Sequence, residues 1–162
     1  MAGKNLVVFY SYEGSTKIIA QTIAEVLNAD MLECKPLKDI GFKGFMKYIW
    51  GGRQVIFKQR PRLETFEKNP EDYTIIIIGT PVWAFNYAPA IRTFLSRVML
   101  KNKKIGLFCC HEGAKGKTLD NLKEVLSHNT IIGEIDFLNV EKNQEENIVK
   151  AKNWAMTLGD KK

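Results

Sequence analysis

The stretch VFYSYEGSTKIIA, residues 8–20, decides how this chain is expected to fold. It starts as an apolar β-type run, passes through a turn rich in hydroxyl side chains, and continues with apolar residues at helical spacing. A turn that opens a helix presents unpaired backbone N–H groups and the positive end of the helix dipole, and both favour an anion. The stretch therefore predicts a strand, an anion-binding loop and a helix, although Glu13 brings a negative charge into that loop.

Strand-type and helix-type patterns alternate along the rest of the chain. Apolar runs predict five strands, at residues 6–10, 31–34, 73–78, 105–110 and 131–140. Apolar residues at helical spacing predict helices near residues 18–27, 91–98, 119–126 and 144–158. Such alternation favours parallel strands joined by right-handed crossovers. We expect one α/β domain over residues 1–162, with a doubly wound five-stranded parallel sheet that binds its ligand beyond the carboxyl ends of the strands.

Composition and length fit a globular protein of ordinary size. The 162 residues are 45% hydrophobic and 26% charged, which is usual for a globular domain. We find neither a signal-peptide pattern nor an apolar run of membrane-spanning length, so the expected location is the cytoplasm. The three cysteines have neither a disulfide framework nor metal-type spacing, and we expect no metal site.

The first loop, SYEGST at residues 11–16, carries the anion-binding features. Gly14 lets the backbone approach a ligand, and the hydroxyl groups of Ser11, Ser15 and Thr16 add donors. The same residues could simply cap the helix, and the loop alone does not separate these two interpretations. The loop matches neither the dinucleotide nor the triphosphate fingerprint, and it holds no cation. A phosphate monoester is therefore the favoured ligand group, with the Glu13 carboxylate turned to solvent.

The second loop follows the third predicted strand and is rich in aromatic residues. Trp83, Phe85 and Tyr87 crowd a turn that should be exposed. Large exposed aromatic side chains are unfavourable unless something covers them. We expect one of the three to fold back onto the core and a flat ligand to cover the others. The run from 80 to 98 has no glycine, and only Asn86 tolerates a positive φ angle well.

The third loop, CCHEGAKGKT at residues 109–118, ends like a triphosphate-binding loop. The glycine that such a loop requires five positions before Gly116 is replaced by His111, so this interpretation is not favoured. Gly113 and Gly116 instead allow the backbone to pass near the far side of a flat ring, whose edges His111 and Glu112 could bind. The two adjacent cysteines are interpreted as buried packing residues, and we expect no catalytic side chain.

The first two loops together resemble those of the flavodoxin family. The family's phosphate loop has the form Ser/Thr-x-Thr-Gly-Asn-Thr; Ser11, Gly14 and Thr16 match it, Ser15 replaces the Asn, and Glu13 replaces a hydroxyl donor. Residues 80–85 resemble the family's flavin-contacting loop, in which Trp83 or Phe85 would stack on the ring. The resemblance implies the strand order 2-1-3-4-5 and the cofactor FMN. It implies a cofactor site made of Ser11, Tyr12, Glu13, Gly14, Ser15, Thr16, Thr80, Pro81, Val82, Trp83, Ala84, Phe85, His111, Glu112, Gly113 and Gly116.

The resemblance favours an FMN-binding electron carrier as the function. The main alternative is an FMN-dependent NAD(P)H or quinone reductase on the same fold, and a flavin-free nucleotide-binding or interaction module is a third. Residues 35–62 hold eight Lys or Arg against Asp39 alone, a charge of +7, so this segment accounts for the whole net charge of +6 and the rest of the chain is −1. We expect this basic segment to dock an acidic redox partner, with NAD(P)H or a quinone as other possible partners. Neither a nucleic-acid partner nor membrane contact is expected.

Overall fold

The computed structural model describes residues 4–38 and 60–160. The strands are β1 (Asn5–Phe9), β2 (Asp30–Glu33), β3 (Ile75–Trp83), β4 (Asn86–Tyr87), β5 (Lys104–His111) and β6 (Thr130–Leu138). The helices are α1 (Ser15–Leu27), α4 (Pro89–Arg97), α5 (Thr118–Val125) and α6 (Gln144–Gly159), with a short 3-10 turn at Pro70–Asp72. Residues 39–59, which form most of the basic segment, lie outside the described residues.

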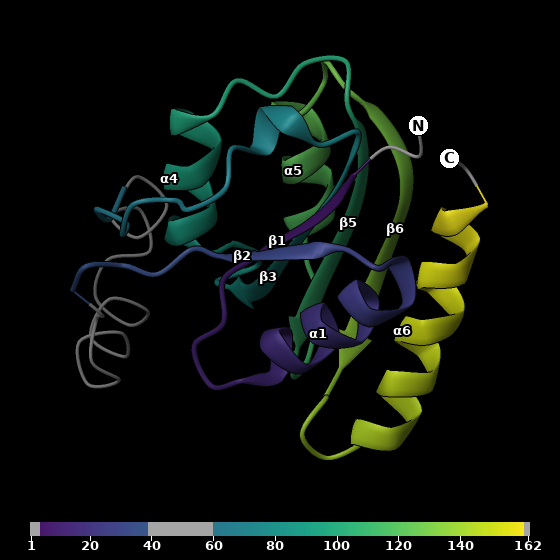
Figure 1. Ribbon diagram of the computed structural model, residues 1–162. Coiled ribbons are helices and arrows are strands. Elements are labelled where there is room, and N and C mark those ends of the chain that lie inside the picture. Colours follow the sequence, from purple (N-terminus) through teal and green to yellow (C-terminus); the bar gives the residue numbers. More distant parts are fainter. Residues whose placement is uncertain (1–3, 39–59, 161–162) are drawn as a thin grey trace.

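A parallel sheet with the order β2-β1-β3-β5-β6 forms the centre of the molecule. The fold class and the predicted strand order are therefore confirmed. Helices α1 and α6 cover one face of the sheet, and α4 and α5 cover the other (Figure 1). Because all five strands run in the same direction, the loops after β1, β3, β5 and β6 meet at one edge of the sheet.

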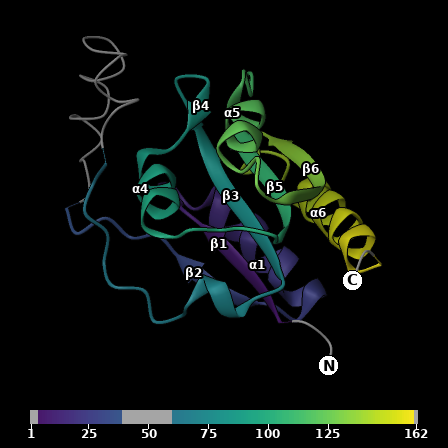
Figure 2. The same cartoon turned by 90° about the horizontal axis from the view of Figure 1, so that it is seen from above.

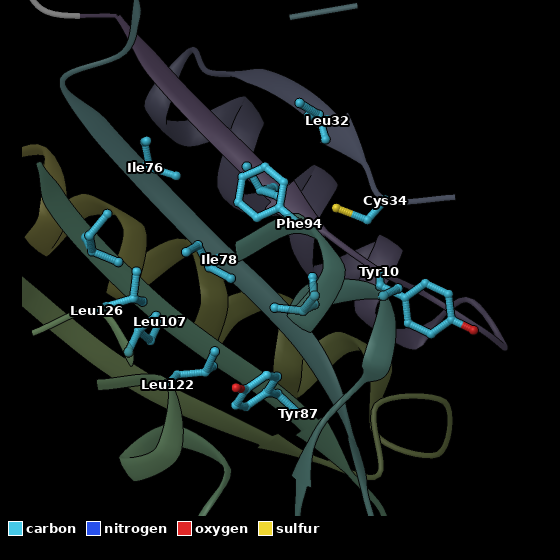
Figure 3. Packing of buried hydrophobic residues seen from close by; sticks show 14 of the residues in the cluster. Tyr10, Leu32, Cys34, Ile76, Ile78, Tyr87, Phe94, Leu107, Leu122 and Leu126 are labelled. Atoms are coloured by element: carbon cyan, nitrogen blue, oxygen red, sulfur yellow. The ribbon is translucent and has the colours of Figure 1, made fainter. Parts of the chain in front are cut away.

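Strand β3 shows why the sheet needs a helical layer on each face. Its residues Ile75 and Ile77 point into the cluster beneath α1 and α6, whereas Ile76 and Ile78 point into the cluster beneath α4 and α5. Figure 3 shows Ile76 and Ile78 in this second cluster, together with Phe94 of α4 and Leu122 of α5. A strand that is apolar on both faces is stable only when both faces are covered.

The end of β3 differs from the sequence prediction. The strand does not stop near residue 78 but continues to Trp83 and then turns back as β4, with Val82 opposite Tyr87 and Trp83 opposite Asn86. Local patterning could not show this hairpin, because each half is short and Pro81 lies inside the first strand. The second loop of the sequence analysis is therefore mostly a β-hairpin that extends beyond the sheet (Figure 2).

The close packing around Gly79 yields a test of this sheet. A methyl group at Gly79 would lie 2.0 Å from the ring of Phe108 on the neighbouring strand β5, and that ring is fully buried. We expect Gly79→Ala to lower the free energy of unfolding by about 1–3 kcal/mol, because an overpacked core must shift. Urea unfolding measures the difference. Gly113→Ala is the matched control, since a methyl group there meets no atom within 4 Å, and equal midpoints for both variants would contradict the packing.

Candidate functional site

A cavity of about 430 Å³ opens at the edge where the loops after β1, β3, β5 and β6 meet. These four loops supply its walls, and the lining residues are Ser11, Tyr12, Glu13, Ser15, Thr16, Pro81, Val82, Trp83, Ala84, Cys110, His111, Glu112, Asn139, Val140, Glu141 and Lys142. The structure thus brings together residues of all three loops that the sequence analysis selected. Gly14, Thr80, Phe85, Gly113 and Gly116 were also predicted for the site, but they are not among the lining residues.

The first loop is shaped by Ser11 and Gly14. The Ser11 hydroxyl oxygen accepts hydrogen bonds from the backbone N–H groups of Gly14 and Lys17, both at 3.2 Å. Gly14 has a φ angle of 111°, which favours glycine, and it directly precedes α1. Ser11 therefore partly stabilises the loop itself, as the capping interpretation supposed, but its hydroxyl proton remains available to a ligand.

The start of α1 keeps the properties of an anion site. The N–H groups of Ser15 and Thr16 lie in the first turn, where the helix offers them no acceptor. The first turn of α1 contains no acidic residue. Glu13 is exposed, as the sequence analysis expected, and it nevertheless lines the cavity. The first loop thus combines helix N–H donors with one carboxylate at its rim.

The β3–β4 hairpin turns through two residues with positive φ angles. Ala84 has φ 48° and Phe85 has φ 64°, so the positive φ angles fall on two residues other than Asn86, the residue of this run that tolerates such angles best. The reason is the register: Trp83 pairs with Asn86, and a two-residue turn with positive φ must then fall on the residues between them. Neither residue is glycine, and each costs about 1 kcal/mol relative to glycine in this conformation.

The three aromatic residues of the hairpin have three different environments. Tyr87 is 5% exposed and belongs to the core beneath α4 and α5 (Figure 3), so it is the one that folds back. Phe85 is 60% exposed at the tip. Trp83 is half-buried in the cavity wall, where the rings of Tyr10 and Tyr12 meet it edge to face at 5.5 and 6.0 Å. Trp83 is thus the aromatic residue of the hairpin that a ligand in the cavity would touch.

Thr80 and Gly116 have structural roles beside the cavity. The buried Thr80 hydroxyl accepts a hydrogen bond from the N–H of Ala88 and donates one to the carbonyl of Pro81, both at 2.9 Å, which ties the two ends of the hairpin together. Gly116 has φ 53° and lies under Phe85, whose Cβ would be 2.5 Å from a methyl group placed there. Both residues therefore position the hairpin from outside the lining.

His111 has a largely buried side chain at the start of the third loop. Its side chain is 8% exposed, and its Nε2 lies 2.8 Å from Asp136, whose other carboxylate oxygen is 3.1 Å from Lys115. Burial pushes the pKa of Asp136 upward, but His111 and Lys115 outweigh it, so that the pKa of this carboxyl lies below its ordinary value. Nδ1 of His111 is buried without a hydrogen-bond partner in the described parts of the chain. The Asp136 contact holds the ring in one orientation.

The sequence analysis missed two parts of the cavity. One is Cys110: adjacent strand residues point to opposite faces, and it is Cys110, not Cys109, that reaches the lining. Burial raises the pKa of both thiols, that of Cys109 to about 12, which agrees with their interpretation as unreactive packing residues. The other part is the loop after β6, residues 139–142. The rule that ligands bind beyond the carboxyl ends of parallel strands would have selected this loop too.

Two further observations concern the side chains and helices that the structure describes. No cluster of His, Cys, Asp or Glu side chains in residues 4–38 and 60–160 could hold a metal ion. Within the same residues, none of the helices has the length and apolar character to cross a membrane. The cavity itself combines an aromatic wall, helix N–H donors, one buried histidine and a rim of charged side chains.

Comparison with known proteins agrees with this geometry. A candidate flavoprotein from Bacteroides eggerthii has a TM-score of 0.76 at 20% identity, over 94% of this chain and 95% of its own. A flavoprotein from Lactobacillus acidophilus, crystallised in complex with FMN, has a TM-score of 0.64 at 24% identity, over 89% of this chain and 98% of its own. Oxidised flavodoxin 1 from Bacillus cereus has a TM-score of 0.59 at 17% identity, over 95% of each chain. At these identities the likeness shows the fold.

Sequence comparison identifies the family. A search of curated protein sequences found no match. The sequence model of the flavodoxin family, in contrast, matches residues 4–155, which is nearly the whole chain. The chain belongs to the flavodoxin family.

Proposed function

We propose that this protein binds FMN in the cavity and serves as an electron carrier. The observation that carries the proposal is that one cavity combines the acid-free N-terminus of α1 with the half-buried ring of Trp83. The first suits a phosphate group and the second suits a flat ring, which are the two ends of FMN. Family membership and the FMN complex of the Lactobacillus acidophilus flavoprotein support this choice.

Different residues of the cavity would bind the phosphate and the ring of FMN. The N–H groups of Ser15 and Thr16, with the Ser11 hydroxyl, would hold the phosphate. Trp83, kept in place by Tyr10 and Tyr12, would form an apolar wall for the ring and exclude water from it. Bound FMN supplies the electron transfer itself, and the protein supplies orientation and electrostatics.

An FMN-dependent NAD(P)H or quinone reductase is the second candidate. The observation that favours it is the position of His111. Asp136 holds this imidazole ring beside the cavity, where it could take part in proton transfer. Two-electron chemistry requires proton transfer, whereas a one-electron carrier does not depend on it. Rapid mixing of the FMN-loaded protein with NADH or NADPH separates the two, because an electron carrier is reduced only slowly without a partner enzyme.

The cytoplasmic location stays a prediction from the sequence.

The identity of the cofactor is directly measurable. Protein purified or reconstituted with flavin should release one FMN per chain on heating, because the first loop suits a monophosphate and lacks a dinucleotide fingerprint. Mass spectrometry of the released compound distinguishes FMN from FAD. Release of FAD, or failure to retain any flavin, would contradict the proposal.

The hairpin offers a matched pair of substitutions. Trp83→Ala should weaken FMN binding about tenfold, because the ring would lose an aromatic wall. Phe85→Ala should change the dissociation constant less than about twofold, because Phe85 is exposed and is not among the residues that line the cavity. Fluorescence titration with FMN measures both constants. Equal losses of FMN affinity in the two variants would contradict the placement of the flavin ring against Trp83 inside the cavity.

The basic segment at residues 35–62 is proposed to dock an acidic redox partner. Reversing Lys43, Lys47 and Lys58 to Glu should slow electron exchange with that partner at low salt and flatten its salt dependence. FMN affinity should stay unchanged, since the described cavity is formed by other loops.

The control for this test is a second triple reversal outside the segment. Lys4, Lys101 and Lys152 are exposed and lie elsewhere in the chain. Reversing them changes the net charge by the same amount. An equal effect of both triple variants on the exchange rate would mean that net charge, and not the segment, governs the encounter.

A further inference from the structure

The rim of the cavity is rich in negative charge, although the proposed ligand is itself an anion. Three of its lining residues are glutamates: Glu13, Glu112 and Glu141. Among the described lining residues, Lys142 is the one Lys or Arg side chain. Lys17, next to the first loop in sequence, directs its ammonium group to Glu33 at 3.3 Å. Lys142 forms no ion pair with any described residue, so its charge is available to a ligand.

The loop that carries Lys142 is firmly attached to the edge of the sheet. The N–H of Asn139 donates to the carbonyl of His111 at 2.8 Å, and the N–H of Lys142 donates to the carbonyl of Asn139 at 3.1 Å. Asn147 of α6 is buried, and its side-chain amide donates to the carbonyl of Leu138 at 3.1 Å. Val140 is buried in the core beneath α1 and α6. The backbone of Lys142 is therefore held at the cavity on both sides.

Two helices lie side by side at this edge, and their first turns differ. Helices α1 and α6 pack against each other (Figure 1) and both follow strands that end at the cavity. The first turn of α6 contains Glu145 and Glu146, whose carboxylates already complement the positive end of that helix. The first turn of α1 contains no acidic residue. The start of α1, and not that of α6, is thus the place left for the negative group of a ligand.

We propose that Lys142 supplies the positive charge that binds the ligand's phosphate at the start of α1 and offsets Glu13. Phosphate loops made only of N–H and hydroxyl donors need no cation, but this loop has a carboxylate where a hydroxyl donor would be expected. A phosphate beside Glu13 is repelled, and a lysine from the loop after β6 compensates the repulsion. The inference rests on the proposed function, because it assumes that the cavity binds FMN.

A comparison of FMN with riboflavin tests the role of Lys142, since riboflavin has the same ring and no phosphate. Lys142→Gln should weaken FMN binding about tenfold, the effect expected of one charge-assisted contact, and leave riboflavin binding within about twofold. Lys142→Arg should retain most of the affinity. Lys152→Gln is the matched control, because Lys152 is an exposed residue of α6 outside the cavity lining. Fluorescence titrations at two salt concentrations provide all of these constants.

Coupling to Glu13 is the second readout. In a Glu13→Gln background the loss caused by Lys142→Gln should be smaller, because less repulsion needs to be compensated. In Lys142→Gln, equal losses of affinity for FMN and riboflavin, or an unchanged dissociation constant for FMN, would overturn this inference but not the proposed function. A wild-type protein that binds riboflavin and FMN equally well would overturn it too. A wild-type protein that binds neither would instead overturn the proposed function, and this inference with it.

Discussion

The parallel pairing of β1, β3 and β5 is the constraint on which the rest of the structure depends. Ile76 and Ile78 are buried on one face of the sheet and Ile75 and Ile77 on the other, so the chain must place helices on both faces. Each crossover then brings the chain back to the edge at which the parallel strands begin, so that every strand ends at the opposite edge. As a result, loops that are far apart in sequence share one edge, and the cavity forms where they meet. The close approach of Gly79 to Phe108 shows how little space this pairing leaves.

The β3–β4 hairpin places its three aromatic residues in three different environments. Antiparallel pairing of Trp83 with Asn86 forces the positive φ angles onto Ala84 and Phe85. The turn then directs Tyr87 into the core, leaves Phe85 at the tip and keeps Trp83 at the cavity. Residues with unfavourable backbone angles persist where surrounding contacts over-determine them. Here the hydrogen bonds of Thr80 join the two ends of the hairpin, and the lack of a side chain at Gly116 leaves room for Phe85.

The charges around the cavity explain how a carboxylate can be tolerated in the loop that is proposed to bind an anion. Glu13 projects from the loop and is exposed, so water screens much of its charge. The first turn of α1 keeps its positive end free of acidic residues, while α6 has two in its own. Lys142 then lies in the loop between β6 and α6, at the same cavity as Glu13. The charge of this site therefore depends on the first turns of α1 and α6 and on the loops that precede these two helices.

The sequence by itself determined the order of strands and helices along the chain and the α/β fold class, and it predicted the first loop as a candidate anion site. These features depend on local periodicity and on turn chemistry, which neighbouring residues carry in full. The strand ends were right to within a residue or two except for β3, whose extension depends on pairing with β4. Only the tertiary structure decided that Trp83 and not Phe85 lines the cavity, whereas the loop at residues 139–142 could have been expected there from its place after a parallel strand. The position of Trp83 follows from the hairpin register, in which Trp83 pairs with Asn86, and a register set by pairing leaves no periodic signal in the sequence.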